Sequence, residues 1–95
     1  MLKQGKRLQD KLLTAVVMAG TGDQARLGLA ISARAVPKAI GRNRIKRLAR
    51  ETFRHCRDRL PALDVVLQAR SGAGAAANPE LRSALERLWN RLAQA

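Results

Sequence analysis

A basic segment bounded by two prolines constrains the fold of this chain more than any other feature. Pro37 suits the first turn of a helix, and Pro61 disfavours helical backbone at the residue before it, so we predict one helix over residues 38–59. At helical spacing, one side of this segment forms an apolar stripe of Ile45, Leu48, Ala49, Thr52 and Cys56. Ile40 falls outside the stripe. We therefore expect the first turn to pack differently from the rest of the helix or to project beyond the sheet.

Positive charge gathers on the opposite side of the predicted helix. The residues there are Asn43, Lys46, Arg47, Arg50, Arg54 and Arg57. Between Arg34 and Arg59 the chain has ten basic residues and only two acidic ones, too few to neutralise the helix by pairing along its surface. Eight of the ten are arginines, whose planar guanidinium suits bidentate contact with phosphate. This pattern favours binding to a polyanionic partner.

The whole chain is small and strongly basic. Its 95 residues suffice for a single domain, which we assign to residues 1–95. The 19 Lys and Arg residues against 7 Asp and Glu give a formal charge of +12, which makes nucleic acid the first partner to consider. An anionic membrane is a weaker alternative, because no apolar run approaches the ~18–20 residues of a spanning helix and the apolar stripe is needed for the core. The N-terminal residues do not resemble a signal peptide, so we expect a cytoplasmic protein.

Two strands are predicted before the basic helix. Residues 11–19 form an apolar, β-branched run followed by a turn. Residues 26–33 alternate, with one face predicted for the core and a small or polar face opposite. The core face comprises Leu27, Leu29, Ile31 and Ala33, and the other face comprises Arg26, Gly28, Ala30 and Ser32. The short connection between the two strands predicts an antiparallel pair.

The segment after the basic helix predicts a strand, a loop and a second helix. Residues 63–70 read as a short strand, and residues 71–77 as a flexible loop of low complexity. Asn78 suits the N-cap of a helix, with Pro79 at its first position. Leu81, Ala84, Leu85, Leu88 and Leu92 then recur at helical spacing. Trp89 borders that stripe, and we expect it to anchor the core.

Residues that could act in catalysis or hold a metal are few. Cys56 is the sole cysteine and His55 the sole histidine, so neither a disulfide nor a zinc site is expected, and both residues are interpreted as structural. No nucleophile motif, carboxylate cluster or phosphate-binding loop accompanies them. One Trp, one Phe and no Tyr do not provide an aromatic surface for stacking bases. Recognition of a folded RNA through its shape and phosphates fits better than base stacking.

Residues 36–54, VPKAIGRNRIKRLARETFR, carry a family resemblance. An Arg-Asn-Arg triplet followed by Ile-Lys-Arg and then Arg-Glu-x-Phe-Arg resembles the signature of the bacterial ribonuclease P protein component. Residues 26–32, 64–70 and 80–92 resemble the flanking elements of that family. The resemblance implies an α+β fold, a two-layer sandwich with a mostly antiparallel sheet. In it the basic helix crosses between two parallel strands with a left-handed connection, against the usual right-handed rule, and an amphipathic helix ends the domain.

The resemblance also implies an accessory role in an endoribonuclease. Catalysis would belong to an RNA subunit that binds most of the Mg²⁺, and the substrate would be precursor tRNA; no obligate protein partner is implied. The residues expected to bind the RNA are Arg42, Asn43, Arg44, Lys46, Arg47, Arg50 and Arg54. The residues expected to line a cleft for the 5′ leader are Gly28, Ala30, Ser32, Arg34 and Lys38. The alternative is a non-catalytic protein that binds structured RNA, such as a ribosome-assembly factor.

Two departures from the family pattern affect the expected leader cleft. The chain begins where an N-terminal helix carrying Phe residues should end, so we expect most of that helix to be missing, and Leu2 stands where an aromatic residue is common. After the strand serine the chain has Ser32-Ala33-Arg34, where the family often has paired lysines. We expect both departures to weaken binding of the leader while binding to the RNA subunit stays intact.

Overall fold

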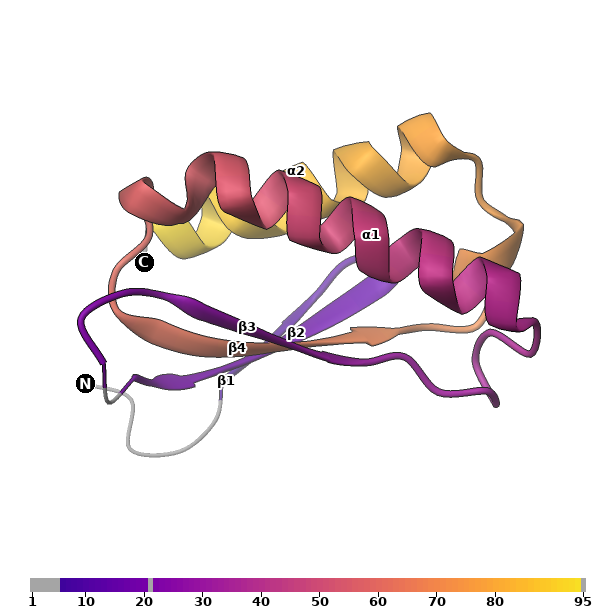
Figure 1. Cartoon of the computed structure of the whole chain (residues 1–95), viewed down its shortest axis with the longest axis horizontal. Coiled ribbons are helices and arrows are strands. Elements are labelled where there is room, and N and C mark those ends of the chain that lie inside the picture. The colour runs from indigo at the N-terminus through magenta and orange to yellow at the C-terminus, as the bar shows by residue number, and fades with distance from the viewer. Residues whose placement is uncertain (1–5, 21, 95) are drawn as a thin grey trace.

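The chain folds into a four-stranded sheet with two helices packed on one face (Figure 1). This computed structural model describes residues 6–20 and 22–94. The elements are β1 (Lys6–Gln9), β2 (Leu13–Ala19), β3 (Arg26–Ala30), α1 (Ala39–Cys56), β4 (Leu63–Ala69) and α2 (Asn78–Ala93), with short 3-10 turns at Arg57–Arg59 and Ala73–Ala75. The basic helix therefore begins and ends within a few residues of its predicted limits.

The sheet has the strand order β1-β2-β4-β3. β1 pairs with β2 and β2 with β4 in antiparallel fashion, whereas β3 and β4 are parallel and α1 connects them. These findings confirm the expected α+β class and the crossover of the basic helix between two parallel strands. The left hand of that connection stays a prediction from the resemblance.

The core lies between the sheet and the two helices. The predicted stripe of α1 is buried throughout, and Phe53 joins it at 6% exposure. Leu13, Ala15 and Val17 of β2 meet it from the sheet, together with Val65 and Leu67 of β4. Trp89 of α2 is 2% exposed, and its ring meets Phe53 edge to face at 5.2 Å between centroids. The prediction that Trp89 anchors the core is confirmed.

The predicted antiparallel pairing of the first two strands was wrong. β2 and β3 do not touch as neighbours, because β4 lies between them and pairs with both. β4 buries Val65 and Leu67 and half-buries the residues around them, which suits the middle of a sheet. Sequential proximity of β2 and β3 is outweighed by this gain in buried apolar surface. β1, which no pattern in the sequence indicated, supplies the remaining neighbour of β2.

The third strand is shorter than predicted. β3 ends at Ala30, because the chain turns at Ser32, whose Oγ accepts a hydrogen bond from the Ala35 amide at 3.1 Å and whose carbonyl accepts one from the Val36 amide at 3.0 Å. Ala33 lies in this turn and is exposed, so its assignment to the core was wrong.

The segment before α2 is more ordered than its composition predicted. Residues 71–77 contain the 3-10 turn Ala73–Ala75, and Ala73 and Ala76 are buried. Asn78 is the first residue of α2 rather than its N-cap, a position that Ala77 takes. The predictions about the N-terminal helix and Leu2 concern residues 1–5, which lie outside the described residues.

Candidate nucleic-acid interface

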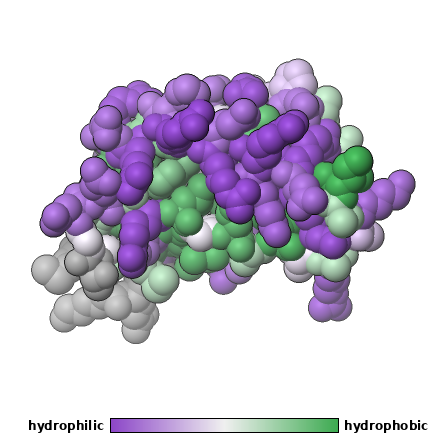
Figure 2. Space-filling model, viewed as in Figure 1, coloured by the Kyte–Doolittle hydropathy of each residue, from purple (hydrophilic) through white to green (hydrophobic). Residues whose placement is uncertain are grey.

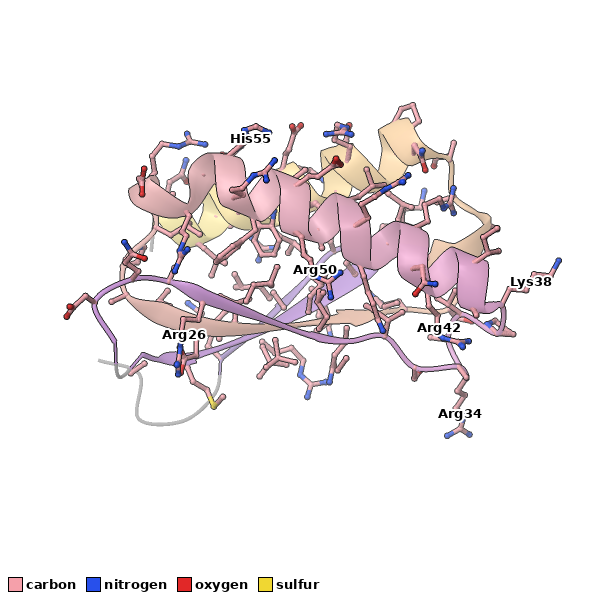
Figure 3. The ribbon with its side chains drawn as sticks, in the orientation of Figure 1. Arg26, Arg34, Lys38, Arg42, Arg50 and His55 are labelled. Atoms are coloured by element: carbon pink, nitrogen blue, oxygen red, sulfur yellow. The ribbon has the colours of Figure 1, made fainter. Side chains whose placement is uncertain are left out.

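Four basic side chains form a continuous row along α1, which we call the cationic ridge: Lys46, Arg47, Arg50 and Arg54. Because the stripe that includes Ile45, Leu48 and Ala49 faces the core, these side chains project from the other side of the helix. Arg47, Arg50 and Arg54 are exposed and Lys46 is half-buried. Hydrophilic side chains cover α1 in the space-filling view (Figure 2). Figure 3 shows Arg50 directed toward the β3 side of the helix and His55 directed away from the sheet.

Internal ion pairing leaves the cationic ridge available. Within residues 6–20 and 22–94, the ion pairs join Arg26 to Asp64, Arg87 to Asp10 and, at 4.0 Å, Arg82 to Glu51. None of them involves a member of the cationic ridge. A row of arginines whose donors are not taken up by carboxylates can place several guanidinium groups on successive phosphates.

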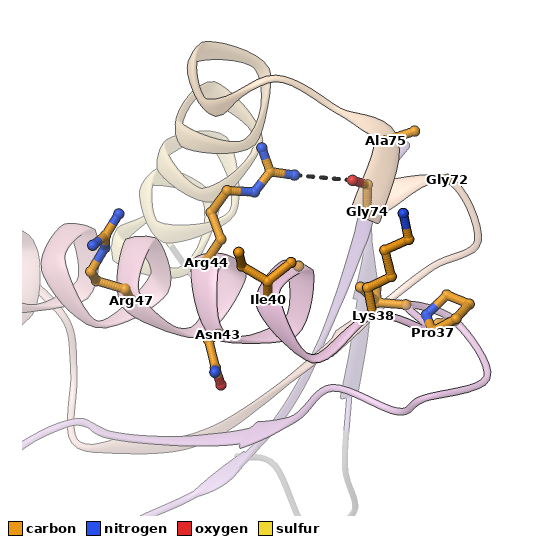
Figure 4. Close-up of a pocket in the computed structure, with 12 residues that line it drawn as sticks. Pro37, Lys38, Ile40, Asn43, Arg44, Arg47, Gly72, Gly74 and Ala75 are labelled. Atoms are coloured by element: carbon orange, nitrogen blue, oxygen red, sulfur yellow. Dashed lines mark hydrogen bonds between the residues drawn. The ribbon is translucent and has the colours of Figure 1, made fainter.

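The three residues of the Arg-Asn-Arg triplet point in different directions. Arg42 Nη1 donates hydrogen bonds to the carbonyl oxygens of Val36 at 3.0 Å and Pro37 at 2.9 Å, which holds the loop before α1. Arg44 Nη1 donates to Asn78 Oδ1 and its Nη2 to the Gly74 carbonyl, both at 3.1 Å. Asn43 is exposed and points away from the Gly72–Ala75 segment (Figure 4). Both arginines therefore organise the fold around the start of α1, with remaining donors free for a ligand.

The sheet face away from the helices carries two of the predicted cleft residues. Gly28 and Ala30 are exposed there, and Gly28 lies opposite Val66 in the register of β3 and β4. At the start of β3, both guanidinium nitrogens Nε and Nη2 of Arg26 donate to the Asp64 carboxylate, at 3.1 and 3.2 Å. These hydrogen bonds lower the pKa of Asp64, so the pair stays ionised near neutral pH. This face is a shallow surface of small side chains with a fixed charge pair at one end.

The other three predicted cleft residues lie beyond β3. Ser32 uses its hydroxyl in the turn that ends the strand, and Arg34 extends from that turn into solvent (Figure 3). Lys38 lies at the start of α1, where it lines a pocket together with Ile40 and Arg44. The structure thus divides the predicted cleft set between the open sheet face, a turn and a separate pocket.

Sequence reasoning missed that pocket. One of its walls is the Gly72–Ala75 segment, whose composition suggested a flexible loop. The position of Ile40 off the apolar stripe was the available signal, and Ile40 is indeed 78% exposed.

Neither His55 nor Cys56 belongs to an assembled reactive site. Cys56 is buried in the core, and that burial raises the pKa of its thiol, which keeps it protonated. His55 is exposed on α1. Over residues 6–20 and 22–94, no three His, Cys, Asp or Glu side chains are placed to hold a metal ion. The helices in the same part of the chain are too short or too polar to cross a bilayer.

The basic helix packs on a small mixed sheet and exposes its cationic side to solvent. This arrangement is typical of an RNA-binding α+β domain. The family described as Ribonuclease P matches residues 1–93. The ribonuclease P protein component of Thioalkalivibrio sulfidiphilus is 46% identical over 87 residues, which is 92% of this chain and 72% of that relative. The component of Pseudomonas paraeruginosa is 49% identical over 70 residues, 74% of this chain and 52% of the relative. The chain thus spans about half the length of some relatives it matches.

Solved structures agree with the sequence comparison. The RNase P protein of Staphylococcus aureus superposes with a TM-score of 0.83 at 25% identity, covering 92% of this chain and 80% of that one. The RNase P protein of Thermotoga maritima gives a TM-score of 0.79 at 28% identity, covering 98% and 86%. This chain belongs to the ribonuclease P protein family. Proteins of this family are the protein component of an endoribonuclease, and they assist that enzyme in the 5′ maturation of tRNA.

Proposed function

We propose that this chain acts in the cytoplasm as the protein subunit of a ribonuclease P ribonucleoprotein. The cationic ridge carries the proposal, because its exposed arginines are free to contact the phosphates of the RNA subunit. Arg42, Asn43 and Arg44 contribute from the start of the same helix with the donors that the fold leaves unused. A protein of charge +12 lowers the repulsion between two RNA molecules and raises their local affinity for each other.

The open sheet face is the proposed support for the 5′ leader of precursor tRNA. Gly28 and Ala30 have no bulky side chain, so a single strand can approach the backbone of β3 closely. Ser32 and Arg34 extend this surface beyond the strand, whereas Lys38 lies apart from it, in the pocket at the start of α1. Val66, which lies beside Gly28 in the sheet, is part of an apolar surface. An unpaired base can pack on that surface whatever its identity.

Catalysis and most of the Mg²⁺ are assigned to the RNA subunit. The described side chains do not form the acidic oxygen cluster that Mg²⁺ prefers, so they do not fit a protein-held metal centre. The role of this chain is to bind and to align two RNA molecules.

Cleavage of a precursor tRNA by a bacterial ribonuclease P RNA at low Mg²⁺ tests the proposal. The reaction is run with and without this chain, on substrates with a long or a minimal 5′ leader. Stimulation that grows with leader length supports the proposed roles of both the cationic ridge and the open sheet face. Stimulation that does not depend on the leader supports the role of the cationic ridge alone. Tight binding without stimulation contradicts the proposal and favours an RNA-binding protein without a processing role.

A further inference from the structure

An open pocket lies between the start of α1 and the segment that precedes α2. Its volume is about 1030 Å³, at the upper limit of the usual range of ligand sites. The side chains that give the pocket its chemical character are Val36, Pro37, Lys38, Ile40, Arg44 and Arg47. Figure 4 shows Lys38, Ile40 and Arg44 on the side of α1 that faces Gly72, Gly74 and Ala75. Residues from two separate segments of the chain, 35–47 and 72–75, therefore line one space.

Ile40 is an apolar side chain held in water among cations. It is 78% exposed, whereas the next most exposed large apolar residue of the described chain, Met18, is 43% exposed. Leaving an isoleucine this exposed costs free energy that a bound apolar group would recover. Val36 and Pro37 extend the apolar wall behind it.

The walls of this pocket are fixed by close contacts. A Cβ added to Gly41 or Gly74 would lie 3.0 or 3.1 Å from Val36 Cγ1, so Val36 is held between two glycine backbones. Arg44 is tied across the pocket by its hydrogen bonds to Gly74 and Asn78. A site with walls already in place loses little conformational freedom on binding.

The lining favours an occupant with an anionic part and an apolar part. Lys38, Arg44 and Arg47 are basic, and no acidic residue lines the pocket in the described part of the chain. Arg47 also belongs to the cationic ridge, so an RNA strand on the ridge passes the pocket entrance. Bases that leave a helix at bulges and loops are the parts of RNA that proteins can enclose.

We propose that this pocket receives one unpaired nucleotide of the RNA that the cationic ridge binds. The base packs against Pro37 and Ile40, above the buried Val36, and its phosphate lies at Arg44 and Arg47. This inference rests on the RNA-binding part of the proposed function and adds a preference for RNA that presents an unpaired base beside a helix.

The test compares two RNA duplexes of equal length and charge. Each has about 16 base pairs and one central bulged position, which carries adenine in one duplex and an abasic sugar in the other. The backbone and phosphates are the same, so the ratio of the two affinities reports the base alone. We expect the chain to bind the adenine bulge about fivefold more tightly than the abasic one. This ratio is at the lower end of the affinity gains that protein contacts with a single base provide.

Two substitutions at Ile40 locate the effect in the pocket. Ile40→Asn keeps the number of side-chain heavy atoms but gives the side chain a polar end, and should reduce the ratio to less than about twofold. Ile40→Leu keeps an apolar wall and should preserve most of the ratio. Since the residue is exposed, neither change should disturb the core, which circular dichroism and thermal unfolding verify. Both variants should keep the salt dependence of the unmodified chain, because no cation is removed.

Two results would overturn the inference: equal affinity for the two bulged duplexes, or a ratio unchanged by Ile40→Asn. Cleavage stimulation is a separate readout. If the chain fails to stimulate cleavage but distinguishes the two bulges, the proposed function is contradicted and the pocket assignment stands. If the chain stimulates cleavage but does not distinguish the bulges, only the pocket assignment is contradicted.

Discussion

Trp89 Nε1 of α2 donates a 2.8 Å hydrogen bond to Thr52 Oγ1 of α1 beneath the cationic ridge. The same hydroxyl donates back to the Leu48 carbonyl at 2.9 Å, so it acts as acceptor and donor at once. Both residues are buried, at 2% and 5% exposure. The helix that presents the arginines is thereby fastened to the helix behind it by a polar contact within an apolar core.

Replacing Thr52 by valine should destabilise the fold. Thr52→Val keeps the shape but leaves the Trp89 N–H buried without an acceptor, at a cost of about 1–3 kcal/mol. Thr52→Ser retains the hydroxyl and should recover part of that loss. Urea unfolding followed by the fluorescence of Trp89, the one tryptophan of the chain, measures both variants. A valine variant as stable as the unmodified chain would show that this hydrogen bond contributes nothing to the net free energy of unfolding.

Two arginines of the same helix should differ in their effects on stability. Arg42→Ala removes the donor to the Val36 and Pro37 carbonyls and should lower the free energy of unfolding by about 0.5–1.5 kcal/mol. Arg47→Ala removes an exposed side chain of the cationic ridge and should stay within about 0.5 kcal/mol. Thermal unfolding of the two variants separates the roles, and equal stabilities would contradict the structural role given to Arg42.

Loss of two ridge arginines should weaken RNA binding through its electrostatic part. In Arg47→Ala/Arg50→Ala we expect a lower affinity and a shallower dependence of log affinity on log salt, by about one unit or less per lost phosphate contact. Binding to a bacterial ribonuclease P RNA is measured from low to physiological salt. Arg82→Ala, on α2, serves as a single-charge control off the ridge. An unchanged slope in the double variant would refute the ridge as a phosphate-binding surface.

Acid should weaken the contact between the end of β1 and α2. Arg87 donates to both carboxylate oxygens of Asp10, at 3.1 and 2.9 Å, and these hydrogen bonds lower the pKa of Asp10 below its ordinary value of 3.8. A lowered pKa means that the pair stabilises the fold fully above that ordinary value. The stabilisation is lost as the pH falls through the lower folded-state value.

The variant Asp10→Asn tests this pH dependence. The difference in unfolding free energy between it and the unmodified chain should be largest near neutral pH and shrink steadily below about pH 3.8. Asp23→Asn, at an exposed site, makes the same charge change and serves as the control. A gap for Asp10→Asn that stays constant down to about pH 2 would contradict the role assigned to the ion pair.

Periodicity in the sequence predicted both helices because each has one continuous apolar stripe. The apolar stripes between Ile45 and Cys56 and between Leu81 and Leu92 are buried as expected, since local spacing sets the faces of a helix. Sheet neighbours are set by which strand buries most on both sides, so the place of β4 between β2 and β3 could not be read from chain order. β1, with Leu8 as its one half-buried residue, left too weak an alternation to be recognised.

The candidate site, too, could be predicted from the sequence only in part. The basic side of α1 followed from helical spacing and charge alone. The use of Arg42 and Arg44 to hold neighbouring loops depends on where the Val36 and Gly74 carbonyls lie, and the fold determines those positions. The composition of residues 71–77 indicated a flexible loop, but the burial of Ala73 and Ala76 orders this segment, which forms one wall of the pocket.

The place of β4 between β2 and β3 has a consequence for synthesis of the chain. β3 leaves the ribosome more than thirty residues before its partner strand, and until Leu63–Ala69 emerges neither β2 nor β3 has its shared neighbour. Such distant strand pairing delays the folding step. During that interval the sheet that the basic helix covers is incomplete, and both the apolar stripe and the arginines of the helix are exposed. A nascent chain stalled before Leu63 would therefore expose both to the surrounding RNA and to chaperones, and release past Ala69 would close the sheet in a single late step.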